Sequence, residues 1–386
     1  MAPHSLRPPF WRTLLLLPAL FLGATTAAQA GNTSLATQLG IASTTTLVTF
    51  GDFQPTGADV EGRVAVGGNA IIAGGYSINI VNGYPVGNAG QGSQIYRDGP
   101  ALTVQGNLTY NGGTIAGNVV VGGNYTASSS GSIKGNVAVG GTLDVTRGLP
   151  LLDKSDTASV WGKVLGAQPW QTPYISQKSQ KTDPFALGFD FATTQAQALS
   201  LTHDLAGQKA TGTVAAGNGG LVLAASGKSQ EIFNLTALQA KSNLTITGLA
   251  PGASVLINVA GTAVDFGAHG FNIDFTDGTA GTFGADAGKI LFNLSDAKTI
   301  TGCCFDASLL APLATVTSGS GNINGQVIVN SWRSGVQVNS SPYTGTLPVN
   351  YTPVTEIPEP GSLPLLAGAA GVLFLLVRRK EGTGEA

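Results

Sequence analysis

The chain has 386 residues, of which 55 are glycine and 10% are charged, and its formal net charge is −2 at pH 7. This charge supplies no basic footprint for nucleic acid, and a hydrophobic content of 42% argues against a disordered chain. A glycine-rich chain with few helix formers is typical of folds rich in strands and turns.

The N-terminus has the layout of a secretory signal peptide. Two arginines precede an apolar run at residues 14–24, and Ala28 and Ala30 form a small-residue cleavage site. We therefore expect residues 1–30 to be removed on export. The remaining length fits one large repetitive domain or two ordinary ones, and we favour a single domain at residues 31–350.

A repeated motif, G-x-V-x-V-G-G, is the strongest fold signal in this domain. Copies occur at residues 62–68, 117–123 and 135–141, and the last two are 18 residues apart. In an extended strand the two valines of each copy face one side, toward a common core, and the residue between them faces the other side. Eighteen residues is about one coil of a parallel β-solenoid, and the Gly-Gly pair predicts a sharp turn that side chains would obstruct.

The repeat therefore predicts a mainly β fold, built as a parallel β-solenoid, or β-helix. Asn118 and Asn136 hold the same place in two copies, so their side chains are expected to stack as a ladder that satisfies buried turn amides. An antiparallel sandwich of repeated hairpins is the alternative, because Gly-Gly hairpins would give a similar sequence.

Residues 149–170 and 189–207 depart from the repeat, with Ala, Gln and Leu in place of Gly and Val. In the second segment apolar residues recur at helical spacing between Asp190 and Gly207, which predicts one amphipathic α-helix flanking the solenoid. The polar, proline-marked residues 171–184 are expected to form a loop. Strands are predicted at 221–224, 232–235, 244–247, 255–259, 289–293 and 314–317.

The C-terminal residues 351–386 have three parts in order: Pro358, Glu359 and Pro360, an apolar run at 361–377, and the basic cluster Arg378, Arg379 and Lys380. As a helix, the apolar run would be about 25 Å long, the short end of what crosses a membrane. Basic residues after an apolar segment stay on the cytoplasmic side, which leaves the domain outside. We therefore predict a transmembrane helix at 361–377, with a buried core helix as the alternative.

This tail resembles the PEP-CTERM signal of exopolysaccharide-producing Gram-negative bacteria, which a membrane protease of the exosortase type recognises. The resemblance implies export across the inner membrane, an inner-membrane intermediate held by the C-terminal span, and an exosortase-type protease as a partner. The final location would be the cell surface or the extracellular matrix.

Two further segments resemble the choice-of-anchor A domain, a bacterial surface domain. Residues 46–68 are similar to its opening, and residues 308–312 followed by 321–327 are similar to its closing segment. A similar closing segment occurs in the ice-binding β-helix family, which supports a solenoid flanked by a helix. The resemblance covers about residues 39–347, implies adhesion and supplies no catalytic residues.

Catalytic motifs are not evident, because the chain has no nucleophile elbow, no Walker motif and no zinc-binding helix. We therefore predict that the protein is not an enzyme. A polysaccharide-active enzyme on a β-helix is the alternative, because Asp59, Glu61 and Arg63 alternate and would share one strand face. A salt-bridged strand end is the favoured interpretation of these three residues.

Four further acidic residues form a second group: Asp265, Asp274, Asp277 and Asp286. They offer oxygen ligands for calcium, but their spacing lacks an EF-hand loop, so no cofactor is predicted. The only cysteines, Cys303 and Cys304, are adjacent and exclude a disulfide framework. A vicinal disulfide, a bond between chains and an inert reduced pair stay open.

Aromatic residues favour a binding surface over a catalytic pocket. Tyr84 and Tyr96 lie in a Gly/Asn-rich insertion, where their rings would stack on sugar faces, and packing is an equal alternative. A core or capping role is favoured for Trp161 and Trp170.

These observations together predict an exported surface adhesin that binds polysaccharide, biofilm matrix or neighbouring cells. The candidate binding residues are Asp59, Glu61, Arg63, Tyr84 and Tyr96. A purely structural matrix role is a further alternative. Ice binding would need a regular array of outward threonines, and the sequence offers only isolated threonine pairs, at residues 245 and 247 and at 299 and 301.

Overall fold

The computed structural model describes residues 34–80, 99–152, 156–178, 189–217, 219–267, 271–302 and 304–349. The predicted signal peptide, sorting motif and membrane span at 361–377 lie outside these residues, as do Tyr84 and Tyr96. All described residues belong to one compact unit, and no helix among them is long and apolar enough to cross a membrane.

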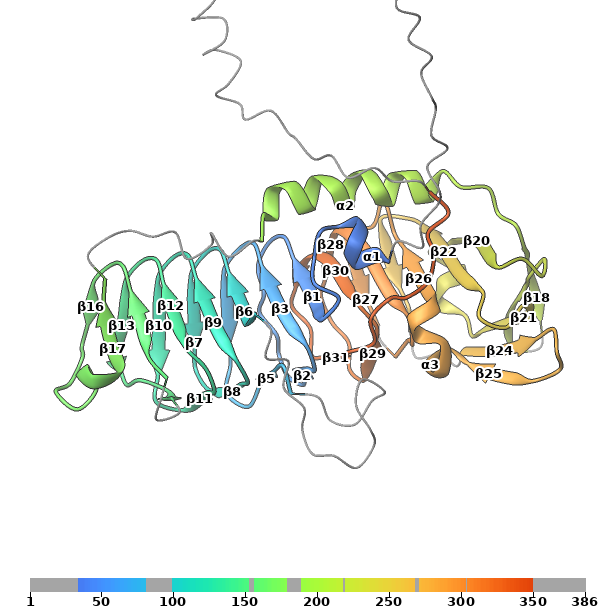
Figure 1. The fold of residues 1–386 in the computed structure, drawn as a ribbon. Helices are drawn as coiled ribbons and strands as arrows, with labels where there is room; N and C mark the ends of the chain where they lie inside the picture. The colour runs from blue at the N-terminus through green and yellow to red at the C-terminus, as the bar shows by residue number, and fades with distance from the viewer. Residues whose placement is uncertain are drawn as a thin grey trace, which may run out of the picture. The chain divides into compact units, whose positions relative to one another are not determined.

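The described residues form a mainly β fold with parallel sheets, as predicted (Figure 1). In the first half, successive coils of the chain add strands to three sheets in turn. The first sheet holds β1 (Thr45–Thr49), β3 (Arg63–Val66), β6 (Pro100–Val104), β9 (Asn118–Val121), β12 (Val137–Val139), β15 (Ala158–Val160) and β17 (Ile175–Gln177). The second holds β4 (Ala70–Ile72), β7 (Leu108–Tyr110), β10 (Tyr125–Ser128), β13 (Leu143–Arg147) and β16 (Val164–Leu165). The third begins with β2 (Asp59–Val60), β5 (Ser77–Ile78), β8 (Gly113–Ile115), β11 (Gly131–Ile133) and β14 (Leu151–Leu152).

The register of β9 and β12 explains the repeat in the sequence. Val119 and Val121 pair with the valines 18 residues further on, and all four side chains are buried. The Gly-Gly pairs are required by the neighbouring coil, because a Cβ on Gly123 would lie 2.6 Å from the backbone oxygen of Gly106. Since these strands pair in parallel, the alternative of an antiparallel sandwich is wrong.

The predicted asparagine ladder forms, but at the surface. Asn118 Oδ1 accepts a hydrogen bond from the backbone N–H of Asn136 at 2.9 Å, and Asn136 Oδ1 accepts one from that of Thr157 at 3.0 Å. Both asparagines are exposed. The ladder therefore ties the side chain of one coil to the backbone of the next and does not satisfy buried turns.

The coils continue beyond residue 149, where the sequence predicted a break. β15 pairs in register with β12, and Ala158 and Val160 take the two inward positions. β17 lies in the segment that was predicted to be a loop. The fold needs only two inward apolar residues and a glycine at the turn, and Gly162 meets the second need because a Cβ there would lie 2.2 Å from the oxygen of Gly141.

The second half of the chain returns so that its last coils meet its first. The longest sheet runs from β17 to β3 and β1, and then continues through β30, β28, β26, β22 and β20. The strands of this half are β18 (Thr213–Gly217), β19 (Gly220–Ala224), β20 (Gln230–Thr236), β21 (Leu244–Leu249), β22 (Ser254–Ala260), β23 (Ala263–Asp265), β24 (Phe271–Phe275), β25 (Ala280–Thr282), β26 (Ile290–Asn293), β27 (Thr299–Thr301), β28 (Ser308–Val316), β29 (Asn322–Asn324), β30 (Val327–Trp332) and β31 (Gln337–Asn339). The strands predicted after the helix are present, except that the one at 314–317 is the end of the longer β28.

One long helix covers the sheet of the returning coils, as the sequence predicted. The helices are α1 (Leu35–Gln38), α2 (Phe191–Ala206) and α3 (Phe283–Asp286). Asp190 caps α2 by accepting a hydrogen bond from the backbone N–H of Thr193 at 3.0 Å, and Gly207 ends the helix. Its buried face, which includes Leu201, packs against β26 and β28 (Figure 1).

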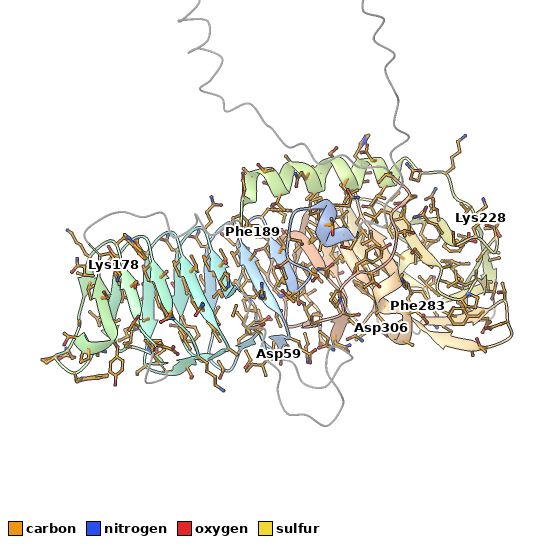
Figure 2. All side chains as sticks on the ribbon, in the orientation of Figure 1. Asp59, Lys178, Phe189, Lys228, Phe283 and Asp306 are labelled. Carbon is orange, nitrogen blue, oxygen red and sulfur yellow. The ribbon has the colours of Figure 1, made fainter. Side chains whose placement is uncertain are left out.

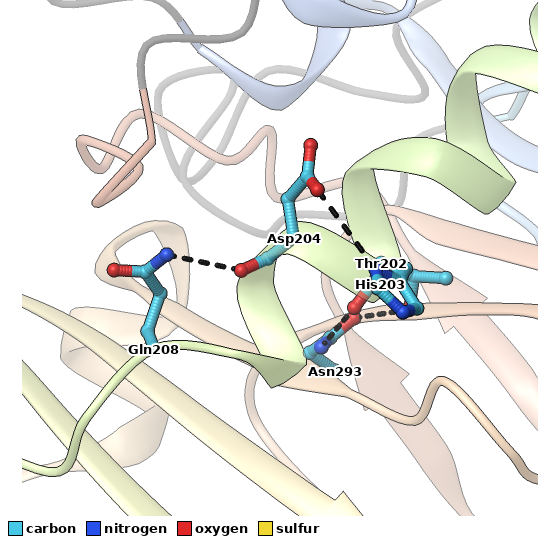
Figure 3. Close-up of polar contacts among 5 residues, drawn as sticks. All are labelled: Thr202, His203, Asp204, Gln208 and Asn293. Carbon is cyan, nitrogen blue, oxygen red and sulfur yellow. Dashed lines mark hydrogen bonds and ion pairs between the residues drawn. The ribbon is translucent and has the colours of Figure 1, made fainter.

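Buried amides fix α2 to the sheet beneath it. Asn293 Nδ2 donates to the backbone oxygen of Thr202 at 2.9 Å, and Asn293 Oδ1 accepts from the Thr202 hydroxyl (Figure 3). Asn258, on the neighbouring strand, donates to the backbone oxygen of Leu205 at 3.0 Å and accepts from Asn293 at 2.9 Å. The helix is therefore held by polar contacts of fixed geometry as well as by its apolar face.

Candidate functional site

Asp59, Glu61 and Arg63 do not share one strand face. β2 ends at Val60 and β3 begins at Arg63, so Glu61 lies at the corner between two sheets. The Glu61 side chain is 1% exposed and accepts a hydrogen bond from the backbone N–H of Ser340 at 3.4 Å, and Arg63 is 9% exposed. Only Asp59, which is half-buried on β2, reaches an accessible surface.

The meeting of the first and last coils places two polar strands beside Asp59. Val60 pairs with Val338 of β31, and Val338 pairs with Ile323 of β29. These three apolar side chains are buried, so the residues that precede them face outward. Asp59, Gln337 and Asn322 therefore follow one another on adjacent strands.

A groove of about 460 Å³ lies on this surface. Its lining residues are Ala58, Gly321, Asn322, Gly335, Gln337 and Asn339. We call it the amide groove. Figure 2 shows Asp59 and Asp306 on the same side of the domain as these strands.

Hydrogen bonds between side chains orient the amides of the groove. Gln337 Nε2 donates to Asn339 Oδ1 at 2.8 Å, and Asn322 Nδ2 donates to Asn324 Oδ1 at 3.1 Å. Asn339 Nδ2 in turn donates to Asn324 Oδ1 at 2.6 Å, and Asn324 Nδ2 donates to Asp306. The amides thus form a connected row in which the nitrogens are used within the protein.

Two features beside the groove are costly to the fold. Asp59 Oδ1 is buried without a hydrogen-bond partner among the described residues, and burial raises the pKa of this carboxyl. Ala58 has a φ of 67°, in the left-handed region that an alanine adopts only with strain. An unsatisfied acceptor and a strained residue next to a groove are what a ligand site retains at the expense of stability.

The other residues predicted from the sequence do not gather at this groove. Trp170 is 64% exposed, so the core or capping role expected for it is wrong, whereas Trp161 is half-buried. His203 is exposed on α2, with Nδ1 3.9 Å from Asp204 Oδ1 (Figure 3). Cys304 Sγ lies 3.5 Å from the backbone oxygen of Ser320, and its neighbour Cys303 lies outside the described residues.

The acidic group considered for calcium does not form a site. Asp265 Oδ2 lies 2.7 Å from Lys241 Nζ, and this cation and the N–H of Gly267 lower the pKa of the aspartate. Across the described parts of the chain, no three His, Cys, Asp or Glu side chains come together in a way that could hold a metal ion.

The amide side chains of the groove were not among the binding residues predicted from the sequence. Gln337 and Asn322 are far from Asp59 in the chain and become its neighbours only because β31 and β2 pair. A signal was present, since polar residues flank one buried apolar residue in both Asn322–Asn324 and Gln337–Asn339.

Comparison with known proteins gives one match. A family model described as "Putative Ice-binding-like adhesive domain" matches residues 38–340, which is well over half of the chain and most of the described fold. No curated protein and no solved structure matches the chain.

Proposed function

Because the chain belongs to the family of ice-binding-like adhesive domains, we propose that it is an exported, non-enzymatic surface adhesin that binds extracellular polysaccharide or neighbouring cells. The family match over residues 38–340 carries this proposal, because it spans the coils of both halves of the fold. The signal peptide at residues 1–30 would direct export. The tail at 351–386 would hold the domain at the inner membrane until an exosortase-type protease acts on it.

The geometry favours an adhesin over two alternatives, a polysaccharide-active enzyme and an ice-binding protein. The carboxylates that suggested an enzyme are separated by the corner at Glu61, which is buried. The threonine pairs that ice binding would need lie in different sheets, one on β21 and the other on β27.

The test is binding of the mature chain, residues 31–386 kept in mild detergent, to exopolysaccharide purified from the producing bacterium. We expect saturable binding, and weaker surface adhesion of a strain that lacks the protein. If the chain binds neither polysaccharide nor cells and the deletion strain adheres normally, the adhesin proposal is wrong. A purely structural matrix role would then be the better explanation.

A further inference from the structure

We propose that the amide groove is the glycan-binding site of this domain and that it takes an uncharged polysaccharide strand laid across β2, β31 and β29. This inference rests on the proposed adhesin function and specifies the ligand class and the residues that bind it.

The first argument is the hydrogen-bonding character of the groove. Gln337 and Asn322 use their nitrogens as donors to neighbouring amides, which leaves their oxygens to accept hydrogen bonds from a ligand. Asp59 is half-buried beside them and adds a carboxylate acceptor, through the oxygen other than the buried Oδ1. Sugar hydroxyls are donors, so they would satisfy these three acceptors at once, and the carboxylate would form the strongest of the three bonds.

The second argument is the shape of the site. Adjacent strands lie about 4.8 Å apart, so three acceptors on β2, β31 and β29 form a row about 10 Å long. Such a row fits consecutive units of an extended polymer better than a single compact molecule. The side chains stand on paired strands, and their mutual hydrogen bonds fix their orientation before a ligand arrives.

The third argument is charge. None of the residues that line the groove is Lys or Arg, and of Asp59, Gln337 and Asn322 only Asp59 is ionisable. A polymer of uronate or phosphate units would meet this carboxylate without a compensating cation. An uncharged glycan avoids the repulsion and still supplies the hydroxyl donors.

A second hollow on the described surface provides the control. It measures about 290 Å³ and is lined by residues of β19, β21 and β24, including Thr245 and Asn272. Asn272 carries an amide like Asn322 and Gln337, although it is exposed and they are half-buried, and it has no unsatisfied buried carboxylate next to it in the described structure. Asn272→Ala therefore removes a comparable amide from a comparable surface.

The experiment measures binding of the full mature chain, residues 31–386 in detergent, to uncharged glucan, mannan and galactan oligosaccharides and to a uronate oligomer of equal length. Asp59→Asn, Gln337→Ala and Asn322→Ala are each expected to weaken binding of the uncharged glycan about tenfold, whereas Asn272→Ala leaves it unchanged. Asp59→Asn keeps the size of the side chain, so it tests the site even if an alanine variant folds poorly. Asp59→Asn should also reduce the ratio of the affinity for the uncharged glycan to the affinity for the uronate oligomer.

The outcomes separate this inference from the adhesin function. If the mature chain binds an uncharged glycan and the three groove variants bind it as tightly as wild type, the groove is not the site and the adhesin stands. Loss of binding in Asn272→Ala alone would move the site to the second hollow. Tighter binding of the uronate oligomer would overturn the ligand class, and absence of any binding, including to the producer's exopolysaccharide, would overturn the adhesin function itself.

Discussion

Replacing Asn293 with alanine should loosen α2 from the sheet. The Asn293 side chain is 1% exposed and connects three groups: the backbone oxygen of Thr202, the Thr202 hydroxyl and Asn258 Oδ1. In Asn293→Ala, the hydroxyl of Thr202 and the Asn258 oxygen would both remain buried, and both would lose their partner. Each buried group left unsatisfied costs about 1–3 kcal/mol, so the free energy of unfolding should fall by about 3 kcal/mol.

Asn234 provides the matched control at the end of the same row. Its Oδ1 accepts a hydrogen bond from Asn258 Nδ2 at 3.0 Å, but the side chain is exposed and water can replace it. Asn258 Nδ2 would keep its second acceptor, the backbone oxygen of Leu205. Asn234→Ala should therefore cost less than about 1 kcal/mol.

Urea unfolding followed by circular dichroism measures both free energies, which are comparable if the two variants have the same dependence on urea concentration. Hydrogen exchange adds a local readout, because Asn293→Ala should speed exchange of the α2 amides more than that of β9 or β12. Equal losses of stability in the two variants would refute the reasoning, since burial would then not decide the cost of the missing amide.

Three other variants test the coils and the core. Glu231 has no exposed surface; burial favours the neutral acid, but hydrogen bonds from neighbouring hydroxyls and backbone N–H groups outweigh burial and lower its pKa below the ordinary value of 4.5. A carboxylate with a lowered folded-state pKa stabilises the fold above that ordinary value, and the contribution disappears as the pH falls through the folded-state pKa. Glu231→Gln should therefore cost about 2–3 kcal/mol at pH 7 and less in acid, measured by urea unfolding at several pH values, and a loss independent of pH would contradict this. Gly123→Ala should cost about 1–3 kcal/mol, because its Cβ would overlap the neighbouring coil, whereas Gly57→Ala, with nothing within 4 Å of the added Cβ, should leave the melting temperature nearly unchanged. Leu201→Ala on the buried face of α2 should cost about 2–5 kcal/mol, and Leu238→Ala, at a residue 82% exposed, less than about 0.5 kcal/mol in the same unfolding assay.

Local patterns in the sequence predicted the local structure well. The alternation around Val119 and Val121 gave the strand and its buried face, and Asp190 and Gly207 gave both ends of α2. Each of these signals depends on neighbours within a few residues, where backbone geometry alone decides which side chains share a face. The prediction of a break at residue 149 was wrong because it required the valines themselves, although Ala158 and Val160 fill the same inward positions.

Long-range pairing could not be read from the sequence. The pairing of β1 with β30 joins residues 47–49 to residues 327–329, and no local pattern shows that the chain resumes after α2 at the far end of the sheet and stacks back toward β1. The amide groove depends on the same long-range pairing, because Asp59 gains Gln337 as a neighbour only where the first and last coils meet. The sequence analysis therefore selected Asp59 as a candidate, but it grouped Asp59 with Glu61 and Arg63, which are buried in the fold.

Hydrogen bonds of asparagine side chains connect neighbouring coils at the surface, where many proteins use ion pairs. This property affects which ligand the surface can bind. The surface ion pair of Lys241 with Asp265 lies among the described residues, while Asn69, Asn107 and Asn124 form a second exposed ladder between coils. Asn69 Oδ1 accepts a hydrogen bond from the backbone N–H of Asn107 at 2.9 Å, and Asn107 Oδ1 accepts one from that of Asn124 at 2.8 Å. The stacking of the coils is thus stabilised by hydrogen bonds between neutral groups, and the strength of these bonds does not depend on salt. A domain stabilised in this way presents a surface of low charge, and binding of an uncharged polymer at such a surface would persist at ionic strengths that weaken adhesion based on charge.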